Sequence, residues 1–223
     1  MSADAQPAAK QSPEKRWWLR TLAVFQAPRP VFAELRDESK AEAEAREEPV
    51  LALIVLAGMA GILLAPETGT WLDQGLVDQS IAVLAVLVFL AGAIYGVVTY
   101  WLAGALLYVG LRGAGSQGGY RRARHVLAFS AAPMVLGLLL VWPLRLVVYG
   151  RDSFRTGGDD FGTGPVLFDA ASGAFAVWSL ALLVYGIAVV ERWSVLRAVV
   201  AVALAGLALI VVTLPFVIPL ASR

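Results

Sequence analysis

The sequence predicts an all-α integral membrane protein: a bundle of five transmembrane helices preceded by one or two cytoplasmic or interfacial amphipathic helices. Of its 223 residues, 59% are hydrophobic and 16% charged, whereas a soluble domain is about half apolar and about a quarter charged. Five apolar stretches are long enough, or nearly so, to cross a hydrocarbon core of ~30 Å, which takes about 20 helical residues. Within a membrane domain over 49–223, we expect spans at about 50–65, 80–111, 126–148, 170–190 and 198–220.

The region before the first span predicts a tail and then helices that touch the membrane. Residues 1–14 are small, polar and proline-containing, which predicts a disordered tail. Residues 15–48 predict cytoplasmic amphipathic helices, interrupted at Pro28 and Pro30 because proline cannot donate an amide hydrogen. Aromatic residues beside lysine and arginine are typical of a helix at headgroup depth, so we expect interfacial anchors at Trp17, Trp18, Phe25 and Phe32. The alternative is a partner-binding face on the second helix.

The first two spans differ in length. The first has 16 residues between two prolines, about 24 Å, which is short for a bilayer. The second has 32 residues, about 48 Å, which predicts one long tilted helix because the run is too short for two spans. Gly92 and Gly96 in this run have the small-xxx-small spacing, which admits a homodimer, with plain bundle packing as the alternative.

The later spans are expected to be helices joined by polar turns. The third carries Pro133 and Pro143, and Ser130 can satisfy a carbonyl that a proline leaves free. A glycine- and aspartate-rich loop follows it, and a tight connection, "ERWSVLR", joins the fourth span to the fifth.

The lysines and arginines predict the orientation. With a cytoplasmic N-terminus, 14 of the 18 fall in inner segments and 4 in outer ones, which is the positive-inside pattern of a five-span protein whose C-terminus is outside. The inner connection between the second and third spans holds four arginines and no acid: Arg112, Arg121, Arg122 and Arg124. We expect these arginines to contact anionic headgroups or a partner protein, and the alternative is that they only set the topology.

The composition argues against several kinds of chemistry. The chain has no cysteine and one histidine, His125, so thiolate chemistry is excluded and no metal site is expected. The five spans contain no aspartate, glutamate or lysine, which argues against a pump or a proton-driven carrier. Asp159 and Asp160 are adjacent in a loop and match neither a paired-aspartate site nor a calcium loop. The sequence therefore predicts a protein that is not an enzyme and has no cofactor, and a net charge of +1 suggests no nucleic-acid partner.

Three stretches resemble one known family. "YVGLRGAGSQGGYRRARHVLAFSAAPMVLG" is similar to the connection between the second and third spans of the Yip (Ypt/Rab-interacting protein) domain family, where a glycine-rich turn precedes a Tyr-Arg pair, a serine and a proline. "AVWSLALLVYGIAVVERWSVLRAVVAV" resembles its fourth and fifth spans. "LAVFQAPRPVFAELRDES" looks like the opening of bacterial members, and the 15 arginines against 3 lysines favour a bacterial source.

The resemblance implies a cytoplasmic N-terminal region followed by a five-helix domain. In eukaryotic relatives it implies binding of prenylated Rab GTPases, but their Asp-Leu-Tyr-Gly-Pro motif is replaced here by "REEPVLA". We therefore expect a non-enzymatic multi-pass membrane scaffold that binds anionic lipid or a partner protein at its cytoplasmic face. The alternative function is a transporter or channel for a neutral or apolar solute, with a path near the third-span prolines.

Overall fold

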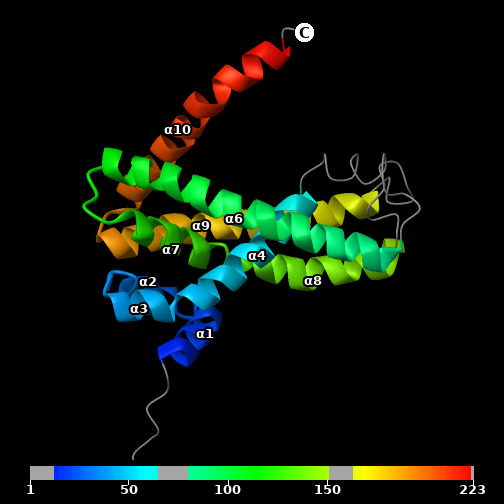
Figure 1. The fold of residues 1–223 in the computed structure, drawn as a ribbon, viewed down its shortest axis with the longest axis horizontal. Helices are drawn as coiled ribbons and strands as arrows, with labels where there is room; N and C mark the ends of the chain where they lie inside the picture. Colours follow the sequence, from blue (N-terminus) through cyan, green and yellow to red (C-terminus); the bar gives the residue numbers. More distant parts are fainter. Residues whose placement is uncertain (1–12, 65–79, 151–162, 222–223) are drawn as a thin grey trace, which may run out of the picture.

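The computed structural model describes residues 13–64, 80–150 and 163–221, and in these ranges the regular structure is all helical (Figure 1). Five helical segments are long and apolar enough to cross a membrane, which confirms the predicted fold class. The predicted tail lies outside the described residues except for residues 13 and 14, and Asp159 and Asp160 lie outside them entirely.

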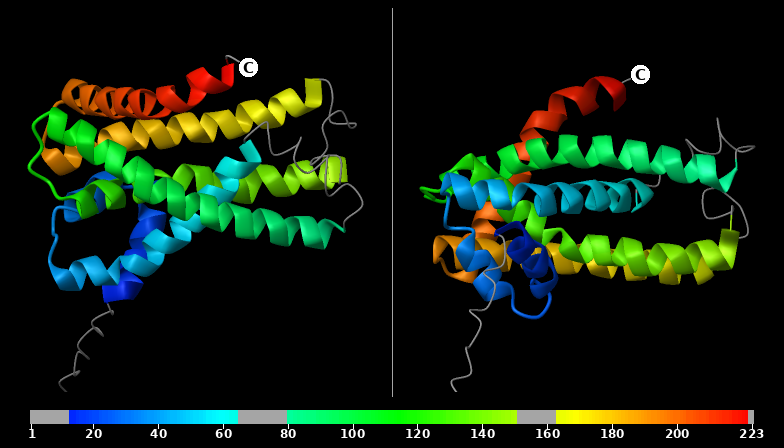
Figure 2. Two further views of the ribbon diagram at one scale, coloured as in Figure 1. Left: turned by 45° about the horizontal axis from the view of Figure 1, so that its top comes forward. Right: turned by 60° about the horizontal axis from the view of Figure 1, so that its bottom comes forward.

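The long helices differ in direction. α6 (Ile81–Gly113), α8 (Ala132–Tyr149) and α9 (Thr163–Glu191) follow the long axis of the molecule, while α4 (Glu47–Leu64) crosses α6 obliquely and α10 (Val195–Ala221) diverges from the other helices (Figures 1 and 2). Glycines allow α4 and α6 to cross closely. A Cβ added to Gly58 would lie 2.5 Å from Gly96 Cα, and one added to Gly92 would lie 2.6 Å from Met59 Cα. The Gly92–Gly96 face is therefore covered within one chain and is not available to a second copy.

The second span is a single helix of 33 residues, as its length predicted. The third is divided. α7 (Tyr120–Ser130) ends at Ala131, and α8 starts directly after it with Pro133 in its first turn. The Ser130 hydroxyl donates to Val126 O at 2.7 Å, and the Met134 amide donates to Ser179 Oγ of α9 at 3.2 Å. The third span expected at about 126–148 therefore lies within one apolar segment, Tyr120–Tyr149, which Ala131 divides into two helices just before Pro133, while Pro143 lies inside α8 without ending it.

The N-terminal region forms three short helices: α1 (Pro13–Ala23), α2 (Pro28–Glu34) and α3 (Lys40–Ala45). They fold back onto the bundle. Arg36 donates to Val190 O at 3.1 Å and also to Val189 O, the last carbonyls of α9. Arg197 of α10 donates to Ala114 O at 2.7 Å. We call the end of the molecule where α1–α3 meet the turns at 114–119 and 192–194 the charged end (Figures 1 and 2).

This arrangement corrects two of the expected membrane anchors. The Trp17 and Phe32 side chains are completely buried. The Trp17 ring lies 5.6 Å from the Phe129 ring of α7, and Phe32 packs over Gly186 of α9, where an added Cβ would meet its ring at 2.6 Å. These two rings face protein because the small residues of α7 and α9 leave room for them, so neither is an interfacial anchor. Phe25 is partly buried against Trp178, and only Trp18 stays well exposed, at 42%.

Candidate functional site

The four arginines that the sequence groups together occupy different environments at the charged end. Arg112 closes the turn that follows α6: its guanidinium donates to Tyr108 Oη at 3.0 Å and to Ser116 O at 3.1 Å. Gly115, at a φ of +91°, allows the chain to reverse there. Arg112 therefore holds the turn in shape, and its donors are partly used within the protein.

Arg122 connects three elements. It pairs with Glu38 at 2.9 Å and with Glu191 of α9 at 3.8 Å, and it donates to Arg36 O at 3.3 Å. Glu191 also accepts from the Ser116 hydroxyl at 2.8 Å. This network ties α7 to α9 and to the segment after α2, so Arg122 is a structural residue rather than a free headgroup contact.

Arg124 lies among aromatic rings. Its guanidinium carbon is 3.8 Å from the Trp101 ring centroid, 4.7 Å from that of Tyr120 and 5.1 Å from that of Tyr100. Such contacts hold a cation without neutralising it. Gly104 permits them, because a Cβ there would lie 3.2 Å from Arg124 Cδ and closer still to Cγ. Arg124 Nε is buried and has no hydrogen-bond partner among the described residues.

Arg121 is exposed and, of the described residues, none forms an ion pair or a hydrogen bond with it. It lines a cavity of about 370 Å³ between α4, α6 and α7. The other lining residues are Glu47, Val50, Leu51, Ile54, Val97, Tyr100, Trp101, Arg124 and His125. Trp101 is 52% exposed and Val97 38%, so the cavity opens on the outer surface of the bundle. This is the place where an arginine of the turn is both accessible and beside a cavity.

The depth of this cavity follows from the length of α6. About 20 helical residues cross a hydrocarbon core of ~30 Å, so a span that starts at Ile81 reaches the far surface near Tyr100 and Trp101. There the Trp101 and Tyr120 rings lie 6.1 Å apart, and Tyr120 Oη donates to Trp101 O at 2.7 Å. Aromatic belts mark membrane interfaces. We therefore expect Arg121 and Arg124 to lie at headgroup depth.

His125 lies beside these arginines, in the wall of the same cavity, and its side chain is 5% exposed. Across residues 13–64, 80–150 and 163–221, no group of three or more histidine, aspartate or glutamate residues could hold a metal ion. His125 is therefore a buried residue of the cavity wall.

Two features of the site escaped sequence reasoning. The rings of Tyr100, Trp101 and Tyr120 come from two helices, and their convergence on Arg124 needs the tertiary structure. Arg46 is the other: it is 1% exposed, donates to Glu42 O at 2.9 Å and Asp37 O at 2.5 Å, and lies 5.1 Å from the Trp17 ring. It fixes the bend between α3 and α4, and its only signal in the sequence was a basic residue in an acidic stretch.

A protein-family model, the Yip1 domain, matches residues 22–216. The match begins in α1 and ends in α10, so it includes the cavity and all five spans. Comparisons with curated proteins and with solved structures find no match. The resemblance seen in the arginine turn and in the last two spans is thus confirmed by a model that covers most of the chain: the protein is an integral, multi-pass membrane protein that belongs to the Yip1 domain family.

Proposed function

We propose that this protein is a non-enzymatic membrane scaffold that recognises anionic lipid headgroups at its charged end, which faces the cytoplasm. The observation that carries this proposal is Arg121, exposed at headgroup depth beside a cavity, with no acidic partner among the described residues. A lysine or arginine near an anionic surface contributes about 1 kcal/mol to binding. Arg112 and Arg122 contribute less, because their donors are engaged within the protein.

A lipid fits the observations better than a protein bound along α2. The apolar edge expected to bind a partner consists of Val31, Phe32 and Leu35, and these side chains are at most 2% exposed. They are covered by the bundle itself, so a partner protein would have to use another surface. Burial of this edge removes the sequence argument for a partner face on α2.

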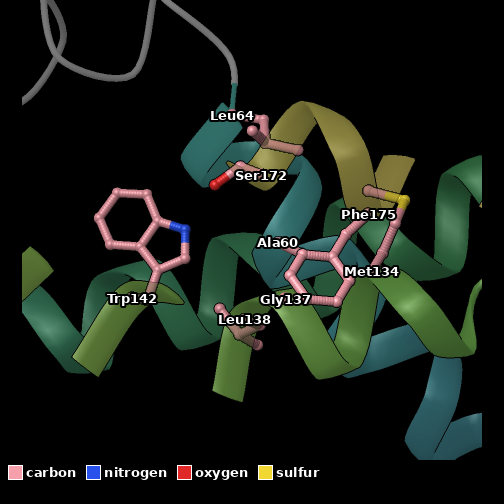
Figure 3. Close-up of a pocket in the computed structure, with 8 residues that line it drawn as sticks. All are labelled: Ala60, Leu64, Met134, Gly137, Leu138, Trp142, Ser172 and Phe175. Atoms are coloured by element: carbon pink, nitrogen blue, oxygen red, sulfur yellow. The ribbon is translucent and has the colours of Figure 1, made fainter. Parts of the chain in front are cut away.

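The transporter alternative expects a path near Pro133 and Pro143. Beside Pro143 the space is the small cavity of Figure 3, which lies between side chains of α4, α8 and α9, including Ala60, Trp142 and Phe175. Its volume is about 10 Å³, about enough for one water molecule. Phe175 packs over Gly137, where an added Cβ would lie 2.9 Å from the ring, and narrows the space further. Beside Pro133 lies a larger apolar cavity of about 290 Å³, but a path past both prolines would also need room beside Pro143, which favours the scaffold.

The test is a comparison of lipids retained by the full-length protein. The wild type is purified in detergent with equal amounts of phosphatidylglycerol and phosphatidylcholine, and bound lipid is counted by native mass spectrometry. We expect the wild type to retain phosphatidylglycerol preferentially. Arg121→Gln should weaken that preference about fivefold, because about 1 kcal/mol of electrostatic attraction is lost.

Arg29→Gln is the matched control, since Arg29 is an exposed arginine of α2 outside the cavity. It removes the same charge and should leave lipid retention unchanged. Equal retention of the two lipids by the wild type, or equal losses in the two variants, would contradict the proposal.

A further inference from the structure

A second, apolar cavity adjoins the one beside Arg121. It measures about 290 Å³ and lies between the same helices, and both cavities are lined by Ile54 and Tyr100. Of the described residues that line it, none is charged. Besides Ile54 and Tyr100, the residues that line this second cavity are Ala57, Gly58, Gly61, Tyr95, Gly96, Thr99, Ala103, Leu127, Ala128, Ala131 and Met134. The two cavities together form one cleft with a charged part and an apolar part.

The apolar part extends away from the charged end. Along α4 the lining passes from Glu47 in the charged part to Gly61 in the apolar part, and along α7 and α8 it passes from Arg121 to Met134. On α6 the two parts overlap, because residues 95–103 line the apolar part and residues 97–101 line the charged part. The apolar lining from α4, α7 and α8 therefore lies toward the hydrocarbon core, and the charged part lies at the depth that we expect for headgroups. This is the polarity of a membrane lipid, whose phosphate lies above its acyl chains.

We infer that this cleft binds one anionic phospholipid, with its phosphate between Arg121 and Arg124 and one acyl chain along the apolar part. The inference rests on the proposed function and names the ligand of the same site: a single built-in lipid, rather than a diffuse layer of headgroups attracted to a basic surface.

The charged part is suited to an anion. Arg121 and Arg124 face Glu47 across the cavity, which leaves one excess positive charge with His125 neutral. Arg124 is held by three rings, and no described residue accepts a hydrogen bond from its guanidinium. Because the rings fix its position without consuming its donors, Arg124 can present them to a phosphate without reorganising.

The apolar part distinguishes a lipid from free phosphate. On α6 it is lined by Gly96, Thr99, Tyr100 and Ala103, which recur at i, i+3, i+4 and i+7 and so form one face of the helix. Gly96 lets α4 approach this face closely, since a Cβ there would lie 3.2 Å from Gly58 Cα of α4. A free phosphate would leave this surface uncovered, whereas an acyl chain covers it. The occupant we commit to is therefore a phospholipid.

The test introduces a larger side chain into the apolar part and leaves Arg121 and Arg124 unchanged. Ala57→Leu puts a branched side chain where the acyl chain lies, and Ala91→Leu, on the exposed side of α6, is the matched control. Full-length proteins are compared by native mass spectrometry for retained dioleoyl-phosphatidylglycerol. We expect Ala57→Leu to retain about tenfold less lipid than the wild type, a loss of about 1.4 kcal/mol, and Ala91→Leu to match the wild type.

A second measurement does not depend on any variant. Glycerol 3-phosphate and dihexanoyl-phosphatidylglycerol are offered to the wild type as competitors of the dioleoyl lipid. We expect glycerol 3-phosphate not to compete and the short-chain lipid to compete weakly, because both lack the long chain.

The outcomes separate the two proposals. If Arg121→Gln loses lipid while Ala57→Leu keeps it, or if glycerol 3-phosphate competes as well as the lipid, the acyl-chain site is overturned and headgroup recognition survives. If the wild type shows no preference for the anionic lipid at all, both proposals fail.

Discussion

Trp17 and Trp18 are adjacent in the chain and have opposite environments. Trp17 is completely buried: its indole donates to Glu42 Oε2 at 2.9 Å, and the guanidinium groups of Arg20 and Arg46 lie 4.7 and 5.1 Å from its ring. Trp18 is 42% exposed. Consecutive helical residues point about 100° apart, so one of the pair faces the bundle while the other faces outward. The attachment of α1 to the bundle therefore depends on Trp17.

Replacing these two residues in turn tests that assignment. Trp17→Ala should remove about 3–5 kcal/mol of packing and release α1, whereas Trp18→Ala should leave α1 in place. Hydrogen exchange of residues 13–23 is the measurement, with α9 as an internal reference. A larger effect from Trp18→Ala would mean that α1 is held by lipid rather than by the bundle.

At the level of helices, the crossing of α4 and α6 depends on the absence of side chains. Gly58, Gly92 and Gly96 bring the two backbones into contact, and a Cβ on Gly58 would lie 2.5 Å from Gly96 Cα and 2.6 Å from Gly96 N. Backbone cannot move aside as the end of a side chain can. The same crossing lines the apolar cavity that we propose as an acyl-chain site, so its geometry should affect both stability and binding.

Gly58→Ala should therefore destabilise the protein by about 1–3 kcal/mol, the usual cost of overpacking. Gly206→Ala is the matched control, because nothing lies within 4 Å of a Cβ at this position of α10 and alanine favours the helix by up to about 1 kcal/mol. Thermal unfolding in detergent measures both variants. If Gly58→Ala unfolds no earlier than the wild type, α4 and α6 are not locked together in the way we describe.

The helices show how far sequence reasoning reaches. Hydrophobic length predicted five spans, and the run at 80–111 predicted the single helix α6, because both follow from the thickness of a bilayer. The break at Ala131 was not predicted, because a proline removes one backbone hydrogen bond both in a kinked helix and in a divided one. What accompanies the division is a tertiary contact: the Met134 amide donates to Ser179 Oγ on α9, and this contact cannot be read from the local sequence. Hydropathy also cannot tell a ring that faces lipid from one that faces protein, so Phe32 was assigned to the membrane.

At the scale of the whole molecule, the N-terminal region is joined to the bundle through contacts between residues far apart in sequence. Arg122 pairs with Glu38, and the two are 84 residues apart. The sequence could identify a basic turn and predict a contact with headgroups, but it could not separate Arg121 from Arg122, because the acids that neutralise Arg122 come from distant segments. The candidate site was therefore predicted as a region, and the structure selects the residues within it.

Arg36 connects the N-terminal region to the C-terminal end of α9. Its guanidinium donates to Val190 O at 3.1 Å and to Val189 O, which also accepts from the Arg192 amide at 3.4 Å, near the C-terminus of α9. A cation is favourable at a helix C-terminus. The surroundings oppose it: burial first, and then Arg192, Arg122 and Arg29, lower the pKa of Arg36. Hydrogen bonding to the carbonyls must therefore outweigh desolvation and repulsion.

We expect Arg36→Gln to weaken docking of the N-terminal region by about 1.5–3 kcal/mol, the range for hydrogen bonds to a charged group. The loss for Arg36→Lys should be smaller than for Arg36→Gln, because lysine keeps the charge but lacks the planar guanidinium whose donors reach both carbonyls. Hydrogen exchange over residues 28–46 reports the change, with Arg29→Gln as the control for loss of charge alone. If Arg36→Lys increases exchange as much as Arg36→Gln, the two-carbonyl geometry of the guanidinium decides the contact. If Arg29→Gln increases exchange as much as both Arg36 variants, net charge decides docking, and the capping role assigned to Arg36 is wrong.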